Sequence, residues 1–144
     1  MPIKRTKIIT LLRRIFKDYP EILAAYLFGS ATETLYREGS DIDVAVLLDE
    51  KLNKLESFSL ELKLGEEIER ELKKKVDLVI LNRVPLALLF QVIRGVLVFE
   101  RNSTQRAIFE AKMLPQCYEN ERFFKMHAKA LYQRARRGRL GILG

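Results

Sequence analysis

Two aspartates separated by a single residue, Asp41 and Asp43, have the type and spacing of a metal-binding pair. They begin a segment, residues 41–48, that alternates at its start and is rich in β-branched side chains, so a strand is expected there. Residues i and i+2 of a strand point to one face, about 6.6 Å apart at 3.3 Å per residue. Two carboxylates on one face of an apolar strand repel each other and require a cation, and hard oxygen ligands suit Mg²⁺. The alternative is a strand that begins in solvent, with Asp41 capping a turn.

The step Gly29-Ser30 stands where an apolar run, residues 22–28, ends and a short helix or turn is expected to begin. Glycine allows the backbone to approach a ligand closely. The N–H groups of Ser30 and Ala31 at a helix N-terminus would favour a phosphate. Gly-Ser is also a common turn, so this feature alone is not specific to phosphate binding.

A third carboxylate, Asp77, interrupts the apolar segment 76–81. Buried strands rarely contain a lone carboxylate. If this segment pairs with the strand over residues 41–48, Asp77 joins Asp41 and Asp43 in one cluster. The alternative is an edge strand with Asp77 pointing outward, and the apolar neighbours argue against it. Together the three features predict a phosphoryl- or nucleotidyl-transfer site with two metal ions on the reacting oxygens.

Alternating strands and helices are expected to position these residues in one α/β domain over residues 1–144, with its core at about 20–105. The predicted strands span residues 22–28, 41–48, 76–81 and 96–99. The predicted helices span residues 4–18, 53 or 57 to 72, and 85–94. A C-terminal helical region over about 103–140 is expected to open at Ser103 or Thr104 and to break or kink at Pro115.

The composition excludes several classes of protein. The single cysteine, Cys117, cannot form an internal disulfide, and one cysteine with one histidine cannot supply a zinc site. Neither a membrane-spanning apolar segment of about 20 residues nor a signal peptide is visible, so we expect a cytoplasmic protein. The net charge of +7 lies in residues 101–144, which contain 10 basic and 3 acidic side chains. Such a basic end attracts acidic or phosphate-bearing partners.

The arrangement of Gly29-Ser30, ten further residues and then Asp41-x-Asp43 resembles the signature of the polymerase-β-like nucleotidyltransferase superfamily. That superfamily places its third carboxylate on a later strand, where this chain has Asp77. The segments 76–83 and 93–101 resemble the minimal nucleotidyltransferases, specifically the MntA-type antitoxins that are paired with HEPN-domain toxins. The resemblance implies an α/β (α+β) fold with a short mixed sheet of about four strands flanked by helices.

The resemblance also implies roles for the candidate residues. Asp41 and Asp43 would hold Mg²⁺ on the triphosphate of ATP, and Asp77 would complete a second Mg²⁺ site and help to deprotonate the attacking hydroxyl. Gly29 and Ser30 would contact the β- and γ-phosphates. The implied reaction is transfer of AMP from ATP to a tyrosine of a partner HEPN toxin, which silences that toxin.

Two other functions stay open at this point. One is nucleotidyl transfer to a small molecule such as an aminoglycoside, which usually needs an added helical domain to form the acceptor pocket. The other is an antitoxin without catalysis, which neutralises its partner by binding through the basic C-terminal region. We do not expect direct nucleic-acid binding, although RNA would also be attracted to that region.

Overall fold

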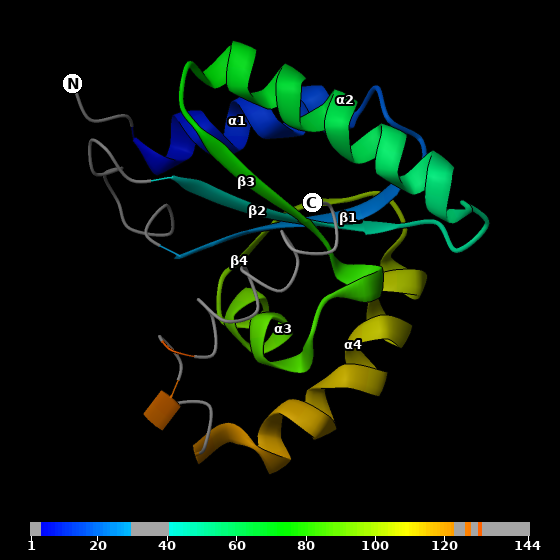
Figure 1. Cartoon of the computed structure of the whole chain (residues 1–144), viewed down its shortest axis with the longest axis vertical. Helices are drawn as coiled ribbons and strands as arrows, with labels where there is room; N and C mark the ends of the chain where they lie inside the picture. The colour runs from blue at the N-terminus through cyan, green and yellow to red at the C-terminus, as the bar shows by residue number, and fades with distance from the viewer. Residues whose placement is uncertain (1–3, 30–40, 123–125, 128–129, 131–144) are drawn as a thin grey trace.

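The computed structural model describes residues 4–29, 41–122, 126–127 and 130. Its centre is one sheet of four strands in the order β3-β2-β1-β4 (Figure 1). β1 is antiparallel to both β2 and β4, whereas β2 and β3 are parallel. The mixed four-stranded sheet that the sequence predicts is therefore confirmed. The strands are β1 (Ile22–Phe28), β2 (Ile42–Leu48), β3 (Val76–Ile80) and β4 (Val96–Glu100).

Two helices, α1 (Arg5–Phe16) and α2 (Lys54–Leu72), cover one face of the sheet (Figure 1). Their buried side chains recur every three or four residues, which places them on one side of each helix. They pack on every second residue of the central strands, such as Val44 and Val46 of β2. The cluster that they form with the sheet is hydrophobic, and the Tyr19 hydroxyl within it donates to Glu67 of α2 at 2.5 Å. Its burial supplies hydrophobic stability.

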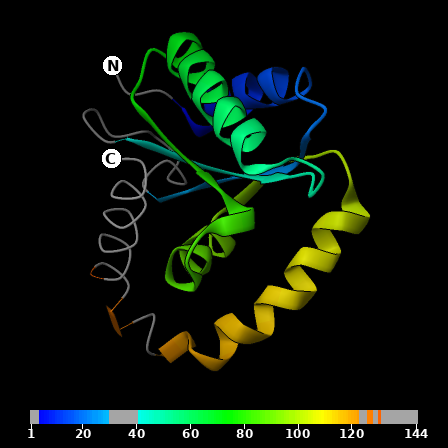
Figure 2. The same ribbon diagram turned by 45° about the vertical axis from the view of Figure 1, so that its right-hand side comes forward.

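Two further helices, α3 (Leu86–Ile93) and α4 (Ser103–Glu119), lie on the opposite face (Figure 2). Their buried residues pack on Tyr26 and Phe28 of β1 and on Ala45 and Leu47 of β2. Cys117 of α4 is 2% exposed and belongs to this second cluster. Because neighbouring residues of a strand point to opposite faces, Asp43 and Asp77 belong to the face covered by α3 and α4.

Asparagine side chains cap the N-termini of two helices, α2 and α4. Asn53 caps α2 by accepting a hydrogen bond from the Glu56 amide at 2.8 Å, and the Glu56 carboxylate accepts one from the Asn53 amide at 3.0 Å, so the first of the two expected starts is correct. The expected opening of α4 at Ser103 is correct, and the preceding Asn102 caps the helix by accepting from the Gln105 amide at 2.9 Å. A break at Pro115 is wrong, because α4 continues through that residue to Glu119.

A short 3₁₀ turn, η2 (Leu81–Arg83), follows β3 where the sequence analysis expected only the end of a strand. The side-chain amide of Asn82 pairs with the backbone of Leu48 as a strand backbone would. The Leu48 amide donates to Asn82 Oδ1 at 2.9 Å, and Asn82 Nδ2 donates to the Leu48 carbonyl at 2.8 Å. This side-chain pairing extends the parallel β2–β3 contact by one residue and closes the far end of the sheet.

Several expectations fall on residues outside the described ranges. These are Ser30, the turn expected to residue 37, and the C-terminal region beyond residue 130. The assignment of residues 1–144 to a single domain therefore stays a prediction. Among the helices that the structure describes, none combines the length and apolar character needed to cross a bilayer.

We predict that Asn82→Ala lowers the free energy of unfolding by about 1–2 kcal/mol, because the amide and carbonyl of buried Leu48 both lose their partner. Urea denaturation measures this loss. Asn120→Ala is the matched control, since Asn120 makes a single bond to a helical carbonyl at the exposed end of α4. Equal stabilities of the two variants would contradict the role assigned to Asn82.

Candidate active site

Asp43 and Asp77 lie side by side on neighbouring parallel strands. The pairing of β2 with β3 runs from Ile42 opposite Val76 to Val46 opposite Ile80, and within it Asp43 is opposite Asp77. Neighbouring strands lie about 4.8 Å apart, and register partners point to the same face. The structure thus brings together two of the three carboxylates that the sequence analysis singled out.

The two carboxylates lie in a partly enclosed setting. Asp43 is only 7% exposed, and Asp77 is half-buried. One oxygen of each, Oδ1 of Asp43 and Oδ2 of Asp77, is shielded from solvent. Like charges at such a spacing repel each other, and burial strengthens that repulsion because the surroundings screen it less than water does. A cation bound at this place would relieve it.

The position of β3 corrects one element of the sequence analysis. The apolar neighbours of Asp77 argued against an edge strand, yet β3 is an edge strand of the described sheet. Its apolar side chains are buried by α2 on one face and by the second core on the other. Even so, Asp77 points to the same face as Asp43 rather than away from it. β3 is therefore apolar in sequence although it is an edge strand, because both of its faces are covered.

Gly29, directly after β1, lies against the Asp43 carboxylate. Phe28 is the register partner of Asp43 across the antiparallel β1–β2 pairing, and Gly29 follows with φ of +69°. A Cβ atom built on Gly29 would stand 2.3 Å from Oδ2 of Asp43. Glycine is thus required twice, for its left-handed backbone and for its close approach to the carboxylate. Ser30, the other half of the expected phosphate contact, lies outside the described residues.

Asp41 precedes β2 and is half-buried. The described part of the chain has no group of three His, Cys, Asp or Glu side chains close enough to hold a metal together. Asp41 thus does not complete a three-carboxylate cluster in this arrangement. Mg²⁺ is commonly held by one or two protein carboxylates, with the remaining ligands from water and substrate phosphates. The Asp43–Asp77 pair beside Gly29 supplies two such carboxylates.

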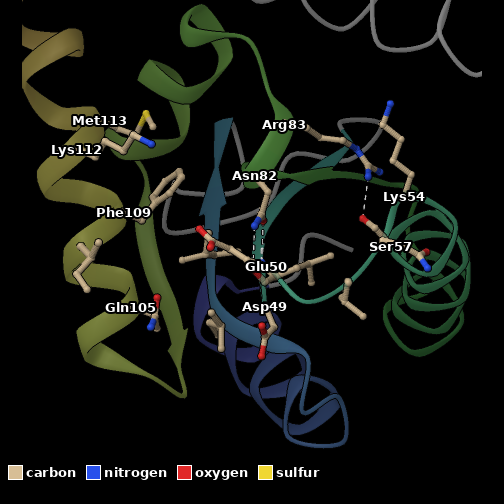
Figure 3. Close-up of a pocket in the computed structure, with 16 residues that line it drawn as sticks. Asp49, Glu50, Lys54, Ser57, Asn82, Arg83, Gln105, Phe109, Lys112 and Met113 are labelled. Carbon is tan, nitrogen blue, oxygen red and sulfur yellow. Dashed lines mark hydrogen bonds between the residues drawn. The ribbon is translucent and has the colours of Figure 1, made fainter.

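A pocket of about 420 Å³ lies at the opposite end of β2 (Figure 3). Leu47, Leu48 and Asp49 line it there, whereas Asp43 is near the start of the strand. Arg83 also lines this pocket. It donates to Ser57 Oγ and pairs with Glu61 at 2.7 Å. The pocket could not be predicted from the sequence, because α4 comes to line it only through tertiary packing.

The buried hydroxyl of Tyr26 is a further polar group on this face of the sheet. It donates to Glu110 Oε1 of α4 at 2.5 Å. Burial, and then the hydrogen bond to Glu110, raises the pKa of Tyr26 well above its ordinary value. Tyr26 thus stays protonated over the physiological range and serves to anchor α4.

Comparisons with known proteins agree with this fold. The family model described as Polymerase beta, Nucleotidyltransferase matches residues 11–104. The protein adenylyltransferase MntA of Shewanella oneidensis is 27% identical over 141 residues, which cover 98% of this chain and 86% of the relative.

Two solved structures share the fold. A toxin–antitoxin structure with AMP-PNP is 25% identical with a TM-score of 0.61, and the match covers 85% of this chain and 97% of that chain. A complex of tri-AMPylated Shewanella oneidensis HEPN toxin with MNT antitoxin has a TM-score of 0.52 at 21% identity. That match covers 96% of this chain and 95% of the other.

We predict that Gly29→Ala destabilises the protein by at least about 1–2 kcal/mol, because alanine is strained at φ of +69° and its Cβ collides with the Asp43 carboxylate. Gly65→Ala is the matched control. Gly65 lies inside α2 with no atom within 4 Å of an added Cβ, so this change should stabilise by about 0.5–1 kcal/mol. Thermal or urea unfolding measures both, and a neutral Gly29→Ala would contradict the described backbone.

Proposed function

The chain belongs to the polymerase beta nucleotidyltransferase family, and we propose that this nucleotidyltransferase moves AMP from ATP to a tyrosine hydroxyl of a HEPN-domain toxin and thereby acts as its antitoxin. The observation that carries the proposal is the register pairing of Asp43 with Asp77 beside Gly29. The likeness to a protein adenylyltransferase and to a toxin–antitoxin structure with AMP-PNP supports the choice of nucleotide and acceptor. We place the reaction in the cytoplasm and call the HEPN-domain acceptor the partner.

The reaction is an in-line displacement at phosphorus. The tyrosine oxygen of the partner forms a bond to the α-phosphorus of ATP. The bond from that phosphorus to the oxygen bridging to the β-phosphate breaks, and pyrophosphate leaves. The hydroxyl proton passes to the Asp77 carboxylate, which projects to the reacting face next to Asp43. Catalysis then consists mainly of orienting the two reactants and balancing charge.

Asp41 and Asp43 would hold Mg²⁺ on the triphosphate, and Asp77 would complete a second Mg²⁺ site, as the resemblance to the family implies. Bound there, the metal would neutralise charge on the phosphates and on the carboxylates. The backbone of Gly29, together with Ser30, would lie against the β- and γ-phosphates, as the resemblance to the family implies.

We predict that Asp43→Asn and Asp77→Asn each lower AMP transfer to the partner by at least about a thousandfold, since each removes a charge at the reacting face. Intact-mass measurement of the partner after incubation with ATP and Mg²⁺ counts the added AMP groups. Asp18→Asn is the matched control, because Asp18 is exposed just after α1, in the layer on the other face of the sheet. Full transfer by either site variant would overturn the proposal.

The remaining outcomes separate the alternatives. A stable complex in which wild-type protein transfers no nucleotide would favour an antitoxin that neutralises by binding. The absence of both transfer and complex would favour a small-molecule acceptor.

A second prediction concerns stability and needs no partner. In metal-free buffer, Asp43→Asn should be more stable than wild type by about 0.5–1 kcal/mol, because like charges on register partners destabilise a sheet. Mg²⁺ with AMP-PNP should stabilise wild type by about 2.7 kcal/mol at a hundredfold excess over its Kd, and Asp43→Asn much less. Thermal unfolding measures both effects. Equal stabilisation of the two proteins would show that the metal binds elsewhere.

A further inference from the structure

The inner face of α4 is fixed to the sheet. Phe109, Met113 and Cys117 pack into the second core, and Tyr26 donates to Glu110. Arg106 adds a bridge, since it pairs with Glu100 of β4 and, at 2.8 Å, with Glu110. α4 is therefore held in place along its length, and its outward face is a surface of defined shape.

That outward face is apolar where solvent-exposed helices are usually polar. Ile108, Ala111, Pro115 and Tyr118 are spaced by three or four residues, so they form one row, and all four are exposed. Ile108 is 58% exposed and Tyr118 is 66% exposed. Single exposed apolar residues are common on proteins, but a continuous row opposite the buried face gives the helix two apolar sides. Such a row is typical of a surface that binds another protein.

The row borders a recess at its N-terminal half. Ile108 and Lys112 line the pocket between α4 and the start of α2, together with Phe109 and Met113 (Figure 3). The side chains that dominate protein–protein binding are usually aromatic or apolar anchors seated in such recesses. A row that leads into a pocket of about 420 Å³ thus offers both a contact surface and an anchor site.

The direction of α4 and the charge of its segment point to one occupant. From its start, α4 runs back along the molecule toward the side on which β2 begins, where Asp43 lies (Figures 1 and 2). Lys112 and Arg122 form no ion pair with any described residue, and the excess of basic side chains in residues 101–144 comes mainly from the sequence that follows α4, since Ser103–Glu119 contains two basic and two acidic side chains. Charge complementarity therefore favours an acidic protein surface.

We propose that the partner toxin docks along the outward face of α4, with an apolar patch on the row from Ile108 to Tyr118, an anchor side chain in the adjoining pocket and an acidic rim. This proposal rests on the proposed function, because it takes the AMP acceptor to be a protein. It deepens that function by stating which surface carries the acceptor to Asp43 and Asp77.

The test compares two pairs of exposed apolar residues. The double variant Ile108→Ser/Tyr118→Ser changes the row, and Leu55→Ser/Leu62→Ser changes α2 in the other layer, where the two leucines are 74% and 53% exposed. Both are made together with Asp43→Asn, so that AMP transfer cannot alter the partner during the measurement. Titration calorimetry with the purified partner should give a Kd at least about tenfold weaker for the α4 variant and unchanged for the α2 variant.

A third variant guards against misfolding. Ala111→Lys places a long charged side chain in the middle of the row without removing a buried contact, and it should weaken binding similarly while the melting temperature stays unchanged. Wild-type affinity in both the Ile108→Ser/Tyr118→Ser and Ala111→Lys variants would overturn the docking proposal.

Transfer is read separately, in proteins that retain Asp43. Normal transfer with wild-type affinity in the α4 variants would reject the docking site and leave the proposed function standing. Weakened binding by the α4 variants, with no transfer even by wild type, would support the docking site and reject the proposed function.

Discussion

Repulsion between two carboxylates on adjacent parallel strands is the constraint on which the active site depends. The β2–β3 pairing sets Asp43 opposite Asp77 and leaves them little freedom to separate. The pairing is maintained by apolar layers on both faces of the sheet and by Asn82 at its far end. The free energy of core packing thus holds the two carboxylates next to each other. A bound cation with a triphosphate would balance their charge.

The two faces of the sheet divide stability from function. The face covered by α1 and α2 packs a hydrophobic cluster with one polar bond, from Tyr19 to Glu67, whereas the face covered by α3 and α4 contains the carboxylates Asp43 and Asp77. Strand alternation produces this division, because each strand gives one set of side chains to each face. The proposed docking row lies on the outer side of the same functional layer. The acceptor and the nucleotide would therefore both bind on this side of the sheet, away from the layer of α1 and α2.

Much of the fold could be predicted from local patterns, and the failures have physical causes. Strand and helix periodicity located all four strands and the four helices, and motif spacing brought Asp43 and Asp77 together. Sequence alone did not reveal that β3 is an edge strand, because α2 and the second core cover both of its faces. The capping role of Asn102 and the pairing of Asn82 with Leu48 were missed because each depends on the exact path of a turn. The pocket beside α4 depends on tertiary packing that no local pattern encodes.

The most direct test of the central claim is a crystal structure with AMP-PNP in which Mn²⁺ replaces Mg²⁺, so that anomalous scattering locates the metal. The account predicts a peak bound by carboxylate oxygens of Asp43 and Asp77, with the triphosphate against Gly29. A nucleotide and metal bound instead in the pocket lined by Asp49 and Arg83, with none at the aspartate pair, would contradict it.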